Sequence, residues 1–176
     1  SLPVRFSTEG LGGSLRKLQS DSAAIGICLL LPAIPENIAA YPLLRIKMVP
    51  VVAPGHPLAS LDHPATHDEL APHVQLVLSD PVDGGGADYG LSSERLWRFV
   101  DLGRRLDFVR AGLGWCRMPE HLVAGLISSG ELQRLSLAED PTPPDGLTIY
   151  AAHKRSHAIG PAGTWLLDDL RSRLSK

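Results

Sequence analysis

Four histidines lie close together in the sequence, and imidazole is a common zinc ligand: His56, His63, His67 and His73. The four-residue spacing of His63 and His67 would put two ligands on one face of a helix. Pro64 lies between them, however, and opposes a helix that carries both. No cysteine or carboxylate stands in register with the four imidazoles. The sequence therefore favours a solvated loop over a metal site.

Cys116 and His121 could act as a nucleophile and its general base. Five residues across a strand-to-helix turn rarely place two side chains in contact, and no third group that would orient the base is apparent. Cys116 and Cys28 both lie in apolar runs, where a free cysteine usually behaves as a small buried hydrophobe. The buried-thiol interpretation is therefore favoured. Without a disulfide framework, a reducing cytosol is the expected compartment.

Other motifs that carry chemistry are absent. The sequence contains no GxSxG, HExxH, Walker loop or GxGxxG pattern. The three glycines at 84–86 precede no helix with a lysine, so a loop is favoured over a phosphate cradle. We expect neither an enzyme nor a cofactor.

The bulk composition is that of a soluble globular protein. The 176 residues suffice for one domain or two small lobes, with 44% hydrophobic and 20% charged residues. The net charge of −2 argues against a chain whose main role is to hold nucleic acid. Arg104, Arg105 and Arg110 fall on one predicted helix, but Asp101 and Asp107 interleave with them and favour a solvated helix face. No apolar run approaches the roughly 18 residues of a membrane span.

Strands and helices are predicted to alternate along the chain. Apolar runs predict strands, and apolar residues at helical spacing predict helices. The strands are expected at 4–8, 23–31, 45–53, 74–78, 95–100, 115–118, 132–137 and 147–152. The helices are expected at 11–20, 67–70, 101–110, 119–128 and 161–175. Thr66 followed by Glu69 fits a capping box for the short helix at 67–70. This order predicts an α/β fold with mostly parallel sheets, beginning with a βαβ unit.

The order of the elements also predicts two lobes. The chain is expected to leave the first lobe, build the second and return after the proline-rich connector at 140–146. Two connecting strands would then act as a hinge beside a cleft. Ligands of such sheets bind at the carboxyl ends of strands.

Several segments, in this order and at this spacing, resemble the effector-binding domain of LysR-type transcriptional regulators. They are VVAPGHPLA at 51–59, WRFVDLG at 97–103, VRAGLGWCRMP at 109–119, HLV at 121–123 and GEL at 130–132.

The resemblance implies two Rossmann-like lobes joined by two crossover strands, as in type II periplasmic binding proteins. Lobe 1 would comprise 1–49 plus 148–176 and lobe 2 would comprise 50–147, with the first strand and helix of lobe 1 missing. It further implies a cytoplasmic homo-oligomer, a dimer or tetramer, that binds a small-molecule effector and no membrane. DNA would be bound only through an N-terminal winged helix-turn-helix domain that this fragment lacks.

The expected fold places a set of candidate effector-binding residues at the cleft, after strands and at helix starts. They are Ser7, Thr8, Glu9, Leu31, Ser79, Asp80, Asp101, Leu102, Gly114 and Trp115. Trp115 could stack on an aromatic ligand or wedge into the interface between the lobes. Asp101 could leave the helix start open to a ligand or cap it.

Two alternatives share the same scaffold. One is a small-molecule enzyme with Cys116 or Glu9 as the acting group, and the other is a secreted solute-binding protein. The resemblance favours the regulator.

Overall fold

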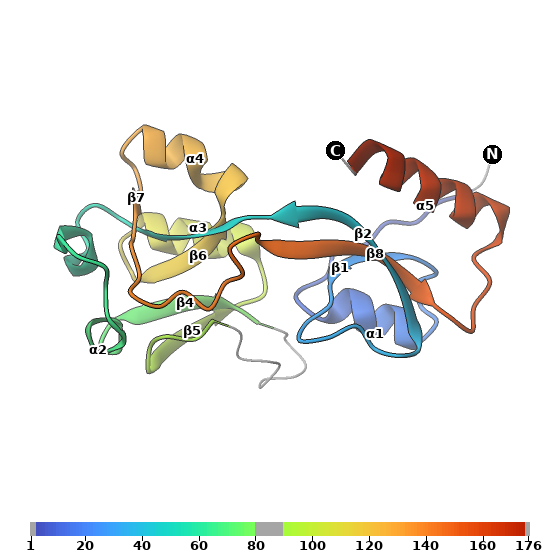
Figure 1. Cartoon of the computed structure of the whole chain (residues 1–176), viewed down its shortest axis with the longest axis horizontal. Coiled ribbons are helices and arrows are strands. Elements are labelled where there is room, and N and C mark those ends of the chain that lie inside the picture. The colour runs from blue at the N-terminus through green and yellow to red at the C-terminus, as the bar shows by residue number, and fades with distance from the viewer. Residues whose placement is uncertain (1–2, 80–89, 175–176) are drawn as a thin grey trace. The chain divides into compact units, whose positions relative to one another are not determined.

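The computed structural model describes residues 3–79 and 90–174, which form two compact units. Among the described residues, unit 1 comprises 3–44 and 148–174, and unit 2 comprises 45–79 and 90–147. Each unit contains its own sheet and its own helices (Figure 1). Each unit combines strands with helices, as the predicted α/β class requires. The prediction of mostly parallel sheets is wrong, because both units contain antiparallel strand pairs. In the described ranges, no helix combines the length and apolar character that a membrane crossing needs.

Unit 1 is built on a three-stranded sheet with the order β1-β8-β2. Its elements are α1 (Gly13–Gln19), β1 (Gly26–Leu29), β2 (Ile38–Ile46), β8 (Leu147–Lys154) and α5 (Gly160–Leu174). Ala152 packs with Leu18 of α1, whereas its neighbour Ala151 packs with Leu167 of α5. Successive strand residues point to opposite faces, so α1 and α5 cover opposite faces of this sheet (Figure 1).

The predicted opening βαβ unit is wrong. Residues 3–10 contain no strand, and Val4 and Phe6 are 61% and 87% exposed. β1 pairs antiparallel with β8, with Gly26 opposite Ala152, and is shorter than the predicted strand 23–31. A strand needs a partner for its backbone hydrogen bonds, and alternation in the sequence cannot supply one. The predicted strand 45–53 is instead the end of β2 followed by β3 (Met48–Val52), with a break at Lys47.

Unit 2 is built on a five-stranded mixed sheet with the order β5-β4-β6-β3-β7. β4 runs parallel to β5 and β6, while β3 runs antiparallel to β6 and β7. The remaining elements of unit 2 are η1 (Pro57–Ser60), α2 (His67–Leu70), β4 (Val74–Leu78), β5 (Arg95–Phe99), α3 (Leu102–Arg110), β6 (Trp115–Pro119), α4 (Glu120–Ser128) and β7 (Gln133–Arg134).

Both faces of the unit 2 sheet are covered. Cys116 and Met118 of β6 lie in an apolar cluster with Val109 of α3 and Val123 of α4. Trp115 points to the other face and lies in a second cluster that includes Leu58, Leu70 and Leu135. This alternation explains why β6 is a continuous apolar run apart from Arg117.

Gly114, immediately before β6, sits where Val74 at the start of β4 leaves no room for a side chain. A Cβ atom at this position would lie 2.4 Å from the backbone carbonyl oxygen of Val74. Gly125, in the middle of α4, has no atom within 4 Å of the equivalent position. The two glycines therefore form a matched pair for testing the packing of unit 2.

We predict that Gly114→Ala lowers the free energy of unfolding of unit 2 by about 1–3 kcal/mol, because the β4–β6 pairing must open to admit the methyl group. Gly125→Ala should be neutral or raise stability by about 0.5–1 kcal/mol, since alanine is the better helix former. Denaturant unfolding followed by circular dichroism measures both. Equal midpoints for the two variants would contradict the close approach at Gly114.

Candidate functional site

The carboxyl ends of two parallel strands meet at one edge of the unit 2 sheet. Leu78, the last residue of β4, lies opposite Phe99, the last residue of β5. The backbone N–H of Ser79 donates to the Phe99 carbonyl at 2.8 Å and extends this pairing by one residue. Asp101 and Leu102 follow Phe99 at the start of α3. The structure thus brings three predicted residues, Ser79, Asp101 and Leu102, to one edge.

Asp101 is the N-cap of α3. Its Oδ1 atom accepts a hydrogen bond from the backbone N–H of Arg104 at 2.7 Å. Leu102 packs against the apolar cluster of α3, α4 and the sheet. The alternative in which Asp101 fills the helix start is therefore confirmed. An acidic ligand at this edge would meet a carboxylate at the helix N-terminus and would need a cation from elsewhere.

Gly114 and Trp115 lie toward the other end of the sheet. Trp115 is level with Gln75 in the parallel pairing of β6 and β4. Ser79, just after the end of β4, is four residues beyond Gln75, which corresponds to roughly 13 Å at the strand rise of about 3.3 Å per residue. The structure does not bring Gly114 and Trp115 to the edge formed by Ser79 and Asp101.

The indole of Trp115 is fully buried. Its Nε1 atom donates to Ser93 Oγ at 3.1 Å, and the Arg117 guanidinium lies 5.4 Å from the ring centroid. A tryptophan with a satisfied N–H and no exposed ring face is a packing residue. Trp115 packs inside an apolar cluster of unit 2, which disfavours stacking on a ligand and differs from the predicted wedge in the lobe interface.

A buried polar network surrounds Arg117, which is 9% exposed. Its Nε atom pairs with Asp140 Oδ1 at 3.1 Å, and its Nη1 atom donates to the Gly90 carbonyl. Gln75 also donates to the Gly90 carbonyl, at 2.8 Å, and accepts from the backbone N–H of Ser92 at 2.8 Å. Because Arg117 has a carboxylate partner, its burial is balanced electrostatically.

Arg105 corrects the prediction of a solvated arginine face on α3. The side chain of Arg104 is 76% exposed and that of Arg110 is 46% exposed, but Arg105 is only 6% exposed. The reason is helical periodicity: Leu102, Arg105 and Val109 fall at i, i+3 and i+7, on the face that packs against the sheet. The same periodicity in the sequence could have identified Arg105 as buried.

In unit 1, two of the candidate residues, Ser7 and Glu9, contact Lys17 of α1. Lys17 Nζ donates to Ser7 Oγ at 3.0 Å and forms an ion pair with Glu9. The hydrogen bond from Lys17 lowers the pKa of the Glu9 carboxyl group. Ser7, Thr8 and Glu9 are all exposed and lie outside regular structure. Glu9 is thus a charged, paired carboxylate, which disfavours a role as a general acid.

The two remaining candidate residues are Leu31 and Asp80. Leu31 follows the buried Leu30 and is 36% exposed. Asp80 lies outside the described residues.

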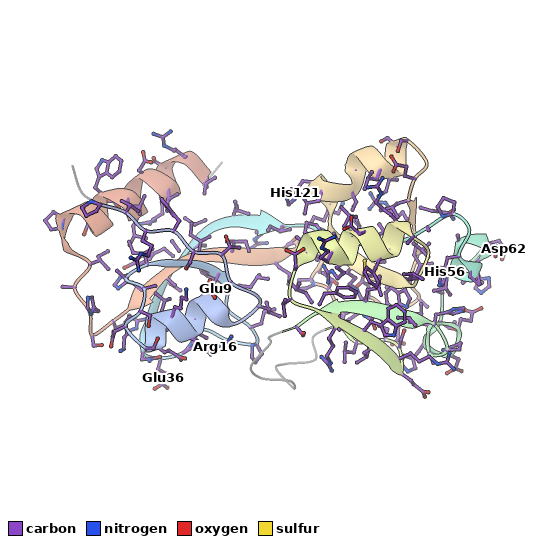
Figure 2. All side chains as sticks on the ribbon, turned by 180° about the vertical axis from the view of Figure 1, so that it is seen from behind. Glu9, Arg16, Glu36, His56, Asp62 and His121 are labelled. Atoms are coloured by element: carbon purple, nitrogen blue, oxygen red, sulfur yellow. The ribbon has the colours of Figure 1, made fainter. Side chains whose placement is uncertain are left out.

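The buried-thiol interpretation of Cys116 is confirmed. Cys116 is fully buried, and burial raises the pKa of its thiol to about 11. His121 lies exposed on α4 (Figure 2). A thiol that is neutral at pH 7 lacks the thiolate character that a nucleophile requires. Cys28 is half-buried, and burial raises the pKa of its thiol to about 11 as well.

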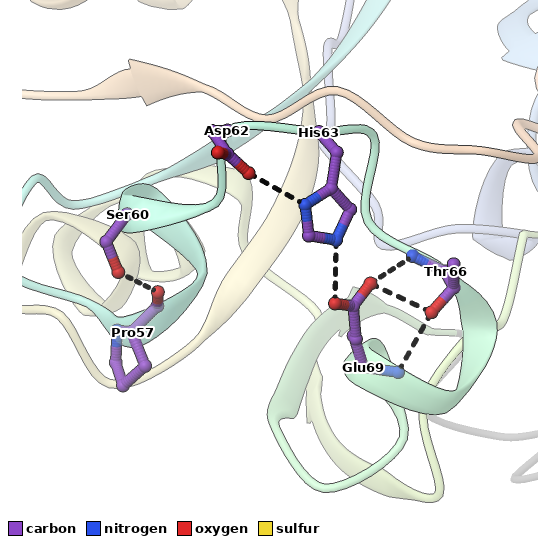
Figure 3. A network of polar contacts seen from close by, with 6 residues as sticks. All are labelled: Pro57, Ser60, Asp62, His63, Thr66 and Glu69. Carbon is purple, nitrogen blue, oxygen red and sulfur yellow. Dashed lines mark hydrogen bonds and ion pairs between the residues drawn. The ribbon is translucent and has the colours of Figure 1, made fainter.

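The histidine-rich segment is organised by carboxylates (Figure 3). His63 Nδ1 lies 3.0 Å from Asp62 Oδ1, and His63 Nε2 lies 2.8 Å from Glu69 Oε1. Glu69 Oε2 accepts from the backbone N–H of Thr66 at 2.9 Å, and Thr66 Oγ1 lies 3.4 Å from the backbone nitrogen of Glu69. The predicted capping box of α2 is therefore confirmed.

These contacts shift two pKa values in opposite directions. The hydrogen bonds from Thr66 and His63 lower the pKa of the Glu69 carboxyl group to about 2. The hydrogen bonds to Asp62 and Glu69 raise the pKa of the His63 imidazole. The rings of His56 and His73 contact each other edge-on, with centroids 5.0 Å apart. Within the described ranges, no three His, Cys, Asp or Glu side chains gather as metal ligands would.

Comparison with known proteins places this geometry in a family. The sequence matches the LysR substrate binding domain over residues 1–175, so the chain belongs to that family. The α/β fold is accordingly the two-lobed fold of type II periplasmic binding proteins, as predicted. No curated protein sequence matches the chain.

Solved structures support the same fold. The effector binding domain of QuiR in complex with shikimate has a TM-score of 0.66 at 21% identity, over 92% of this chain and 76% of that one. The regulatory domain of CcmR from Synechocystis PCC6803 in complex with 2-PG has a TM-score of 0.66 at 16% identity, over 92% and 78%. The regulatory domain of MetR, a LysR family regulator from N. meningitidis, has a TM-score of 0.64 at 17% identity, over 90% and 74%.

The acid limb of unfolding tests the carboxylate network of α2. The depressed pKa of Glu69 stabilises the fold above pH 4.5, and this contribution is lost as the pH falls towards about 2. The raised pKa of His63 acts oppositely: its contribution is present below pH 6.5 and lost as the pH rises through the raised value. Glu69→Gln keeps the capping oxygen but has no carboxylate to protonate. We therefore expect its thermal unfolding midpoint to fall less between pH 5 and pH 2.5 than that of the wild type.

Asp68→Asn is the matched control, because it removes one charge from the same helical turn and leaves the bonds of Glu69 in place. It should retain the pH dependence of the wild type. Parallel acid limbs for Glu69→Gln and the wild type would contradict the role given to Glu69.

Proposed function

We propose that this chain is the effector-sensing domain of a LysR-type DNA-binding transcriptional regulator. It binds a small molecule in a cleft between lobe 1 (1–49 plus 148–176) and lobe 2 (50–147), and binding alters the oligomer on DNA. The match to the LysR substrate binding domain over residues 1–175 is the observation that carries the proposal. DNA contact belongs to an N-terminal winged helix-turn-helix domain of the regulator, which acts in the cytoplasm as a homo-oligomer.

Known structures of the same fold support small-molecule binding. QuiR was solved with shikimate and CcmR with 2-PG, each in its effector-binding or regulatory domain. In this chain, Ser79, Asp101 and Leu102 meet at the carboxyl ends of two parallel strands, where ligands of α/β sheets bind. We propose that these residues contribute to the effector site from unit 2, and that Ser7, Thr8, Glu9 and Leu31 contribute from unit 1.

The chemistry of the candidate catalytic groups supports a regulator rather than an enzyme. Cys116 is a fully buried thiol with a raised pKa, and Glu9 is an ion-paired carboxylate. Cys116 lacks the exposure that a nucleophile requires, and the lowered pKa of the paired Glu9 carboxylate disfavours proton donation.

Thermal unfolding against a panel of small organic acids, amino acids and aromatic carboxylates tests the proposal. A ligand at one hundred times its dissociation constant stabilises the folded state by about 2.7 kcal/mol. For a chain of this length the midpoint should rise by roughly 5–10 °C. A saturable shift confined to one chemical class supports sensing and identifies the effector class.

The functional control is the intact regulator. The compound that stabilises this chain should change the affinity or the footprint of the full-length protein on its operator. Turnover of that compound by the chain, or unchanged DNA binding in its presence, would contradict the regulator assignment.

A further inference from the structure

Arg105 carries a buried positive charge on the inner face of α3. The residue is 6% exposed and lies among side chains that pack on the sheet, such as Leu102 and Val109. Its sequence neighbour Arg104 projects from the same helix, with 76% of its side chain exposed. The two arginines therefore have the same chemistry in opposite environments.

The hydrogen bonds of Arg105 are incomplete. Its Nη2 atom donates to the backbone carbonyl of Arg117 at 3.0 Å, while its Nε atom is buried without a hydrogen-bond partner. Over the described ranges, no carboxylate lies within ion-pair distance of its guanidinium. The acid one helical turn earlier, Asp101, is engaged in capping the backbone N–H of Arg104. Arg105 thus differs from Arg117, which pairs with Asp140.

Neighbouring groups do not balance the charge. The thiol of Cys116 interacts with Arg105, but burial raises its pKa to about 11, so the thiol is neutral at pH 7. Burial lowers the pKa of the Arg105 guanidinium, yet an arginine starts so high that it stays protonated near neutrality. A buried guanidinium without an anion is costly, and buried charges in proteins are usually paired.

The position of Arg105 fits a ligand-binding role. The carbonyl that it contacts belongs to Arg117, in the middle of β6, which runs parallel to β4. Its helix starts directly after the carboxyl end of β5. Arg105 therefore lies one helical turn along α3 from the edge where Ser79 and Asp101 meet.

We propose that Arg105 is the anion-binding residue of this domain, and that the effector is a small organic acid whose carboxylate or phosphate group pairs with its guanidinium. A planar guanidinium offers parallel N–H donors to two oxygens of such a group, and the unsatisfied Nε atom is one of them. This inference rests on the proposed function, since it names the chemical class of the effector.

The test compares acids with their neutral counterparts on the wild-type chain. Thermal unfolding is followed with benzoate against benzamide, shikimate against its methyl ester, and inorganic phosphate against chloride at equal ionic strength. We expect a saturable rise of several degrees with at least one anion and none with its neutral counterpart. The carboxylates and phosphate are separate arms, so the result also identifies which oxyanion is bound.

Variants then assign the effect to Arg105. Arg105→Met should weaken binding of that anion roughly 10- to 100-fold. Arg104→Met removes an exposed charge from the same helix and should bind the anion as the wild type does. In the absence of ligand, Arg105→Met should unfold at or above the wild-type midpoint, because it replaces an unpaired buried charge with an apolar chain of similar length. Arg105→Lys, which keeps the charge without the planar fork, should bind with intermediate affinity.

The outcomes separate this inference from the proposed function. If neutral analogues stabilise the wild type as well as the acids do, or if Arg105→Met binds the anion unchanged, the role of Arg105 is overturned while sensing stands. A ligand-free midpoint of Arg105→Met far below that of the wild type, with Arg105→Lys unaffected, would make Arg105 a structural residue and would also overturn it. If no compound of either kind shifts the wild type, both proposals fail.

Discussion

Burial of β6 on both faces is the constraint on which unit 2 depends. All five residues of this strand are buried, and it pairs with β4 on one side and β3 on the other. Cys116 and Met118 pack against α3 and α4 on one face. On the other face, Trp115 packs against the loop and short helices that precede β4. Because Gly114 has no side chain, the backbone before β6 can lie close to the Val74 carbonyl. β6 pairs with β4, and β4 in turn pairs with β5, so the edge formed by Ser79 and Asp101 is connected to β6 through β4.

The two buried arginines of unit 2, Arg105 and Arg117, differ in whether a carboxylate balances their charge. Arg117 is tied to Asp140 and to the backbone of the segment before β5, so its charge is balanced and contributes to local order. Arg105 has a carbonyl and a neutral thiol beside it and no acid among the described residues. The charge of Arg117 is already paired, whereas the unbalanced charge of Arg105 is available to the anion proposed above.

Membership of the family and the chemistry of the effector are separate questions. The match over residues 1–175 establishes the family, and solved relatives at 16–21% identity share the fold. At that level of identity the side chains that choose a ligand differ freely, because a fold constrains packing positions and leaves site residues open. The effector class must therefore be argued from residues of this chain, of which Arg105 is the most unusual.

The sequence by itself determined the elements whose signals are local. Periodicity located α3, α4 and α5, apolar runs located β4 and β6, and the Thr66 and Glu69 spacing located the capping box. Only the tertiary structure decided that 4–8 forms no strand, that Gly114 lies far from the edge of Ser79, and that Arg105 is buried without an acid. The physical reason is that helical faces and caps depend on residues within one or two turns. Strand pairing, the end of a sheet at which a residue lies and the balance of a buried charge depend on partners far away in the sequence.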